Sequence, residues 1–76
     1  MPARADFTVE PFEEGNPGPH VFAAIAGADP LEANMGPFGT TIEGSLDEVL
    51  TAVGSISRAA MNAGATRVSL NLTVVQ

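Results

Sequence analysis

The segment from Ser45 to Val75 constrains the fold most, because it combines a helix with a defined start and a strand with strict alternation. Ser45 and Glu48 have the spacing of a capping box, in which each side chain accepts a hydrogen bond from the other residue's backbone N–H. Apolar residues then recur at helical spacing until Gly64, which suits the left-handed position after a helix. These apolar positions are Leu46, Val49, Leu50, Val53, Ile56 and Ala60. From Thr66 onward polar and apolar residues alternate, which predicts a strand with one apolar face.

The N-terminal part predicts a second pair of strand and helix. Residues 3–12 alternate and predict a first strand, with Pro11 near its end. Residues 13–19 are rich in Pro and Gly, which predicts a loop. Pro19 suits the first turn of a helix because its φ is fixed, and the apolar residues after it predict a short helix that stops at Gly27.

The centre of the chain predicts a hairpin. Residues 31–35 and residues 40–43 alternate over a few positions, and Gly36–Gly39 between them has the composition of a turn. The elements therefore follow the order strand, helix, strand, strand, helix, strand. This is the order of the ferredoxin-like α+β fold, βαββαβ, a four-stranded antiparallel sheet with two helices on one face. We expect one such domain over residues 1–76.

Small size and the lack of Cys favour assembly. The chain has 76 residues, and a domain of this size buries only about 60% of the surface that its unfolded chain exposes. The absence of Cys excludes disulfides, thiolate metal sites and a Cys nucleophile. The single His20 gives little support to a zinc site or a Ser-His-Asp site. By elimination, we expect extra stability to come from a homo-oligomer.

The net charge of the chain limits the classes of partner that it is expected to bind. Nine acidic residues and three basic residues give a net charge of −6. Such a surface disfavours nucleic acid and anionic membranes and favours a cationic small molecule, although acidity alone also keeps a protein soluble. No apolar run approaches the roughly 20 residues of a membrane span, and the first residues lack the apolar stretch of a signal peptide. We therefore expect a cytoplasmic protein with no membrane or nucleic-acid partner.

Alternation assigns polar side chains to the face of the sheet that the helices leave open. They are Arg4, Asp6, Thr8, Glu10, Glu32, Asn34, Thr41, Glu43, Arg67, Ser69, Asn71 and Thr73. One solvated face is common in antiparallel sheets, so this face needs no further function. The alternatives are a small-ligand site, a wet interface between subunits, or both. Short Thr, Ser and Asn side chains beside carboxylates offer donors and acceptors that suit a heteroaromatic ring.

Catalytic and metal-binding motifs are weak. Asp6, Glu10 and Glu43 are candidates for acid–base pairs, but no spacing in the sequence fixes their separation, and each also fits a surface charge. His20 is expected on the surface at a helix start. We therefore expect no enzymatic activity, no cofactor and no metal site.

The turn at Gly36–Gly39 and two aromatic residues are further candidates. The turn lacks the Lys and the Gly spacing of a phosphate-binding loop and joins two strands, so we interpret it as a turn alone. Phe12 and Phe38 can stack on a ligand ring, but either one equally fits core or interface packing.

Three segments, taken in order, resemble the small thiamine-binding family of ferredoxin-like proteins. They are residues 36–44 (GPFGTTIEG), 45–50 (SLDEVL) and 63–68 (AGATRV). The family shows a Gly-Thr-x-Ile/Val-Glu-Gly strand, an Asp-Glu-Val helix start and an Ala-Gly-Ala-x-Arg-Val approach to the last strand. The resemblance covers most of residues 5–75. It differs in the first helix, which has about four turns in the family and room for only about two here.

The resemblance implies a homotetramer, built as a dimer of dimers, that binds thiamine or its hydroxymethylpyrimidine moiety with no known chemistry on it. The positions expected near the ligand are Thr40, Thr41 and Glu43 from the matching motif, with Asn34, Thr8 and Phe38 added by neighbourhood. A cationic thiazolium suits the negative charge of the chain. The alternative is a structural or regulatory oligomer, in the manner of ACT-like domains, with another effector or none.

Overall fold

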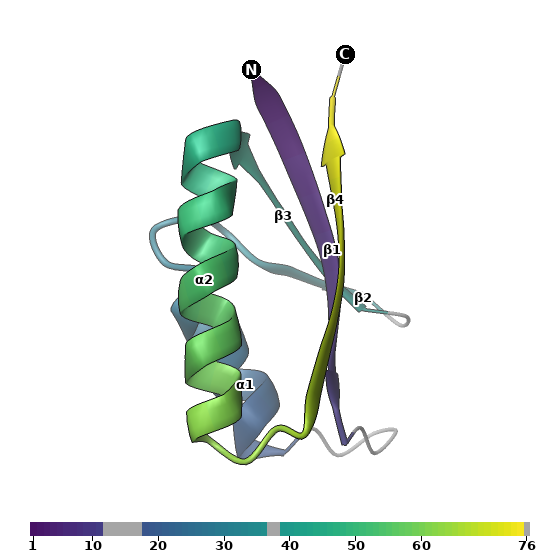
Figure 1. Ribbon diagram of the computed structural model, residues 1–76, viewed down its shortest axis with the longest axis vertical. Helices are drawn as coiled ribbons and strands as arrows, with labels where there is room; N and C mark the ends of the chain where they lie inside the picture. Colours follow the sequence, from purple (N-terminus) through teal and green to yellow (C-terminus); the bar gives the residue numbers. More distant parts are fainter. Residues whose placement is uncertain (12–17, 37–38, 76) are drawn as a thin grey trace.

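A four-stranded antiparallel sheet carries two helices on one face (Figure 1). The computed structural model describes residues 1–11, 18–36 and 39–75. The elements are β1 (Pro2–Glu10), α1 (Pro19–Gly27), β2 (Asn34–Gly36), β3 (Gly39–Ser45), α2 (Leu46–Asn62) and β4 (Arg67–Val74). The strand order is β2-β3-β1-β4, which confirms the ferredoxin-like α+β fold. Among the described residues, no helix is long and apolar enough to cross a membrane.

The predicted capping box starts α2. The Glu48 N–H donates to Ser45 Oγ over 3.1 Å, and the Ser45 N–H donates to Glu48 Oε1 over 2.9 Å. The backbone and side chain of Ser45 lower the pKa of Glu48, because they donate to its carboxylate. The helix then runs to Asn62, and its buried stripe consists of Val49, Ala52, Ile56 and Ala60.

The core lies between the helices and one face of the sheet. On β1 and β3, every second side chain faces the helices and is buried: Ala3, Ala5, Phe7, Val9, Thr40 and Ile42. The two helices approach closely, because a Cβ on Gly27 of α1 would lie only 2.9 Å from the carbonyl oxygen of Ser55 on α2. A larger residue at Gly27 would force the helices apart.

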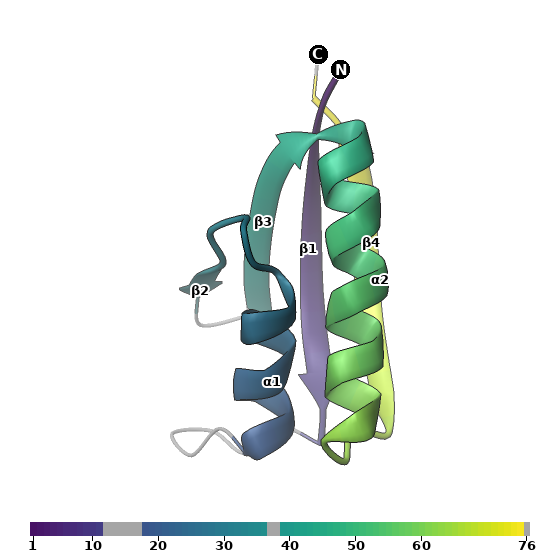
Figure 2. The ribbon, with the colours of Figure 1, turned by 90° about the vertical axis from the view of Figure 1, so that its left-hand side faces the viewer.

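Figure 2 shows how the two helices share the sheet. The short α1 lies on the side of β2 and β3, and α2 lies on the side of β4. The chain termini lie together at one end of the sheet (Figures 1 and 2), where the Val75 N–H donates to the Pro2 carbonyl over 2.9 Å. At the same end, the Leu46 N–H donates to the Met1 carbonyl over 2.7 Å, which fixes the start of α2 against β1.

The predicted second strand, residues 31–35, was placed wrongly. The strand β2 runs only from Asn34 to Gly36, and Glu32 precedes it in the connection instead of lying on the open face. The connection leads from the helical layer to the edge of the sheet, and Leu31 and Ala33 pack against the core on the way. Their alternation therefore reflects core packing outside a strand.

The expectation of a surface His20 was also wrong. Its side chain is buried, with a residue exposure of 9%, and its Nε2 bonds to the carbonyl of Pro11. The first turn of α1 lies against the end of β1, so this imidazole joins the two elements and satisfies a carbonyl that no strand pairs. Phe12 and Phe38 lie outside the described residues.

Candidate functional site

A row of polar side chains crosses the whole open face of the sheet. Asn34 pairs with Thr41, Thr41 with Asp6, and Asp6 with Asn71, so one residue of each strand joins what we call the polar row. Neighbouring strands lie about 4.8 Å apart, which makes the row about 14 Å long. A planar heterocycle is shorter than this row, so one ligand can meet several of its members.

Asp6 is the centre of this row. Its Oδ1 accepts a hydrogen bond from Thr41 Oγ1 over 2.8 Å, and its Oδ2 lies 3.5 Å from Arg4 Nε. The Asp6 side chain is nevertheless 45% exposed, so solvent or a ligand still reaches the carboxylate. The hydroxyl and the guanidinium hold the carboxylate in one orientation, which prepares it to accept from a ligand N–H.

The row next to the polar row contains only small residues. Gly36 pairs with Gly39, and Thr8 pairs with Ser69. Gly39 lies beside Thr8, because a Cβ on Gly39 would be 3.3 Å from Thr8 Cγ2 and 2.9 Å from the carbonyl oxygen of Phe7. The φ of Gly39 is +152°, which disfavours any larger residue there. This small-residue row therefore places only short side chains, or none, beside Asp6.

Charged residues border these two rows. On one side, Arg4 pairs with Glu43 of β3 and with Thr73 of β4. On the other side, Arg67 Nε lies 4.0 Å from Glu10 Oε2. Carboxylates and guanidinium groups thus alternate across the open face. Exposed ion pairs of this kind contribute little to stability.

The structure brings most of the expected ligand residues together. Thr41, Glu43, Asn34 and Thr8 all lie on the open face, within the polar row or next to it. Thr40 lies on the opposite face of β3, buried to 6% exposure beside Ile42, and is therefore separated from the other four. Phe38 lies outside the described residues.

Sequence reasoning missed Asp6 and Asn71 as ligand candidates. It placed both residues on the open face, and it named Asp6 in addition only as a possible acid–base group. Strand register brings both residues into line with Thr41, because Asp6 pairs with Thr41 on one side and with Asn71 on the other. Strand register is the signal that would have found them, and alternation alone does not supply it.

The acid–base and metal readings receive no support from the described part of the chain. The Asp6 carboxylate contacts Arg4 and Thr41, and the Glu10 carboxylate lies near Arg67, so the partners of both carboxylates are hydrogen-bond donors. Within residues 1–11, 18–36 and 39–75, no group of three His, Cys, Asp or Glu side chains has the geometry to hold a metal ion.

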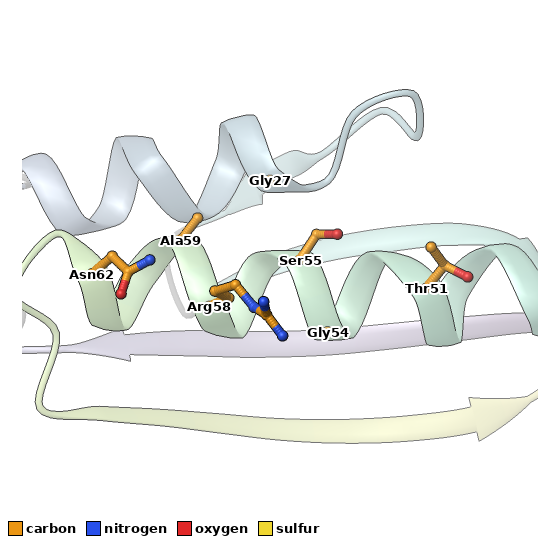
Figure 3. A pocket seen from close by; sticks show the side chains of 7 residues that line it. All are labelled: Gly27, Thr51, Gly54, Ser55, Arg58, Ala59 and Asn62. Carbon is orange, nitrogen blue, oxygen red and sulfur yellow. The ribbon is translucent and has the colours of Figure 1, made fainter.

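Two hollows lie on the helical side, away from the polar row. The larger has a volume of about 640 Å³ (Figure 3). Its lining residues are Gly27, Thr51, Gly54, Ser55, Arg58, Ala59 and Asn62. The smaller, of about 290 Å³, lies between the end of α1 and the start of α2 and includes Asp29, Asp47 and Glu48. None of the described residues expected near a ligand lines either hollow.

Comparison with known proteins settles the family. The model of the thiamine-binding proteins matches residues 5–76, which is nearly the whole chain. This chain belongs to the thiamine-binding protein family. The membership confirms the resemblance carried by the three sequence segments, and a binding role is the coarse function that it supports.

Solved structures show the same fold. A protein from Streptococcus pneumoniae matches with a TM-score of 0.78 at 22% identity, over 100% of this chain and 89% of that one. A protein from Thermotoga maritima, proposed to act in thiamine biosynthesis or salvage, matches with a TM-score of 0.71 at 21% identity, over 99% and 85%. A domain of unknown function from Bacillus cereus matches with a TM-score of 0.72 at 25% identity, over 100% and 76%. No curated protein matches the chain.

Proposed function

We propose that this member of the thiamine-binding family binds thiamine or its hydroxymethylpyrimidine moiety on the open face of the sheet, without catalysis. The observation that carries the proposal is the family match over residues 5–76. The protein would act as a carrier, buffer or sensor of the ligand, in the cytoplasm and without a cofactor of its own.

The polar row has the groups that an aminopyrimidine requires. The ring carries an exocyclic amine next to a ring nitrogen, that is, a donor beside an acceptor. The Asp6 carboxylate accepts from the amine, and the amides of Asn34 and Asn71 each offer both a donor and an acceptor. The Thr41 hydroxyl already donates its proton to Asp6, so its two lone pairs are left to accept from a ligand. The short side chains of the small-residue row would lie beside the ring.

Charge supports the same ligand. Thiamine carries a fixed positive charge on its thiazolium ring, and the chain has a net charge of −6. Glu43 lies on the open face one pair along from Thr41, where it can face the cation. We propose Thr8 as part of the surface beneath the ring. For Thr40, buried on the other face, we propose a supporting role in holding β3 in place.

A matched pair of variants tests the proposed site. Asp6→Asn and Glu32→Gln each remove one negative charge, but only Asp6 lies in the polar row, while Glu32 is exposed in the connection before β2. The asparagine keeps an oxygen that accepts from Thr41, so the fold should survive. Loss of a charge-assisted hydrogen bond should weaken thiamine binding about 10- to 100-fold in Asp6→Asn. Calorimetry measures this, and Glu32→Gln should bind like the wild type. Equal affinities in all three proteins would contradict the assignment.

We further propose that identical subunits assemble, as a dimer of dimers. Support comes from the 76-residue length, the absence of Cys and the exposed apolar side chains of β4 and α2. The negative charge argues against nucleic acid as a partner.

A structural or regulatory oligomer of the ACT-like kind is the second candidate. One observation favours it: the two hollows described above lie on the helical side, away from the open face where the ligand is proposed to bind. Absence of binding with both thiamine and hydroxymethylpyrimidine, on a folded oligomer, would select this alternative.

A further inference from the structure

The larger hollow on the helical side is lined by polar side chains that the fold leaves unused (Figure 3). They are Thr51, Ser55, Arg58 and Asn62, whose spacing places them in one stripe along α2. No hydrogen bond or ion pair joins any of these side chains to another described residue. On the same helix, by contrast, the Ser57 hydroxyl donates to the Val53 carbonyl over 2.8 Å. The stripe therefore offers hydroxyl, amide and guanidinium groups to a molecule in the hollow.

Arg58 makes this hollow positive on an otherwise acidic protein. The other two basic residues, Arg4 and Arg67, each lie near a carboxylate on the open face. Among the described residues that line the hollow, Arg58 alone is charged. Side chains on a helix lean toward its N-terminus, so the guanidinium extends over the turn that contains Gly54 and Ser55 (Figure 3). A guanidinium binds both oxygens of an oxyanion through parallel N–H groups, so this hollow suits an anionic ligand.

Gly54 is a feature of the hollow that packing does not explain. A Cβ on Gly54 would meet nothing within 4 Å, so the fold has room for a side chain there. Glycine in the interior of a helix is destabilising relative to alanine, yet Gly54 lies in the middle of α2. The missing side chain keeps the hollow open and lets a ligand approach the helix backbone closely. Gly27 differs, because its close contact with α2 requires a glycine.

Size and charge define the class of ligand. The volume of about 640 Å³ lies within the range of about 300–1,000 Å³ that small-molecule sites occupy. The smaller hollow shares Thr51 and Ser55 with the larger one and carries Asp29, Asp47 and Glu48. These carboxylates repel a second negative charge at that end of the larger hollow. One guanidinium therefore suits a monoanion whose remaining polar groups are neutral.

We propose that the larger hollow binds a small hydroxylated monocarboxylate, of the chemical class of the sugar acids. Its carboxylate accepts two parallel hydrogen bonds from Arg58, and its hydroxyls bond to Thr51 and Ser55. The Asn62 side chain leans over the turn of Arg58, where its amide can donate to the same carboxylate. The site lies on the helical side, away from the polar row, and does not depend on which ligand the polar row binds.

A titration followed by two-dimensional NMR of the whole chain tests the ligand class, with gluconate as the probe. At constant ionic strength, gluconate should shift the amide signals of Gly54, Ser55 and Arg58 saturably and leave those of Asp6 and Thr41 in place. Glucose has no charge and should cause no such shift. Glucose 6-phosphate carries nearly two negative charges and should bind more weakly than gluconate. No saturable shift with gluconate, an equal shift with glucose, or a tighter complex with glucose 6-phosphate would each overturn the proposal.

Substitutions test whether gluconate binds in the hollow. Arg58→Gln removes the guanidinium, and Arg67→Gln is the control, because it makes the same change in net charge at a 69% exposed side chain on the open face. The affinity for gluconate should fall at least about 10-fold in Arg58→Gln and stay unchanged in Arg67→Gln. Gly54→Gln should be at least as stable as the wild type and should also bind more weakly, because the new side chain fills the hollow. Equal affinities in the two arginine variants, or normal binding by a folded Gly54→Gln protein, would contradict the site.

The two proposals fail separately. A protein that binds thiamine but gives no saturable shift with gluconate refutes the hollow alone. A protein that binds gluconate in the hollow but gives no heat with thiamine or hydroxymethylpyrimidine refutes the proposed function alone.

Discussion

The close contact of α1 and α2 at Gly27 allows a quantitative test of the helical packing. A Cβ at this position would lie 2.9 Å from the Ser55 carbonyl oxygen and 3.0 Å from Ile56 Cα. Both atoms belong to the backbone of α2 and cannot rotate away. Gly27→Ala therefore requires α1 to shift against α2, and such overpacking costs about 1–3 kcal/mol.

Gly54 of α2 provides the matched control for the substitution at Gly27. A Cβ at Gly54 meets nothing within 4 Å, and the residue lies in the middle of α2. Gly54→Ala should therefore stabilise the protein by about 0.4–1 kcal/mol, because alanine has fewer unfolded conformations to lose and a better helix propensity. The same Gly→Ala substitution should therefore lower the free energy of unfolding at Gly27 and raise it at Gly54.

Thermal unfolding followed by circular dichroism measures both effects at one protein concentration. For a domain of this size, 1 kcal/mol corresponds to a change in Tm of about 4–8 °C. We expect Gly27→Ala to melt at least about 4 °C below the wild type and Gly54→Ala to melt a few degrees above it. A Gly27→Ala protein as stable as Gly54→Ala would refute the close helix contact.

Two further predictions concern the cap of α2 and the two faces of β3. Ser45→Ala should cost about 1 kcal/mol in urea unfolding. Because the folded state lowers the pKa of Glu48, its stabilising effect is complete above the ordinary value of 4.5 and is lost as the pH falls through the lowered pKa. Glu48→Gln should therefore flatten the acid limb of stability against pH, and an unchanged limb would contradict the role of the cap. Ile42→Ala should cost about 2–5 kcal/mol, because Ile42 is fully buried, whereas Thr40→Val should fold normally and keep ligand binding. Loss of ligand binding in a well-folded Thr40→Val protein would contradict this and indicate that Thr40 contributes to binding.

The elements with local signals were predictable from the sequence. The capping box of Ser45 and Glu48, the alternation of residues 66–75 and the Pro19 start of α1 are each encoded within a few residues. Once these elements have an order, the handedness of the crossovers leaves few topologies, so the fold class followed.

Features that depend on tertiary contacts were not predictable. The alternation of residues 31–35 suggested a strand, but Leu31 and Ala33 serve the core before β2 begins. Nothing near His20 in the sequence shows that Pro11 would present it with a carbonyl. A buried polar group needs a hydrogen-bond partner, and the partner here is nine residues away along the chain.

The candidate site likewise has features that local sequence patterns predict and features that depend on tertiary contacts. Alternation correctly placed Thr8, Asn34, Thr41 and Glu43 on the open face. The family motif added Thr40 to the expected ligand residues, although alternation places Thr40 on the opposite face. Register, which is set by three strand pairings at once, gave Asp6 its central position. Residues that lie on four different strands, such as those of the polar row, are therefore recognised as a group only in the folded structure.

A calorimetric titration of the wild-type protein with hydroxymethylpyrimidine, alongside one with thiamine, tests the central claim most directly. Both molecules contain the pyrimidine that the polar row is proposed to bind, so both should give saturable heat. Thiamine should bind more tightly, because only thiamine adds a positive charge near Glu43. The absence of saturable heat with either molecule, on protein that circular dichroism shows to be folded, would contradict the proposed function.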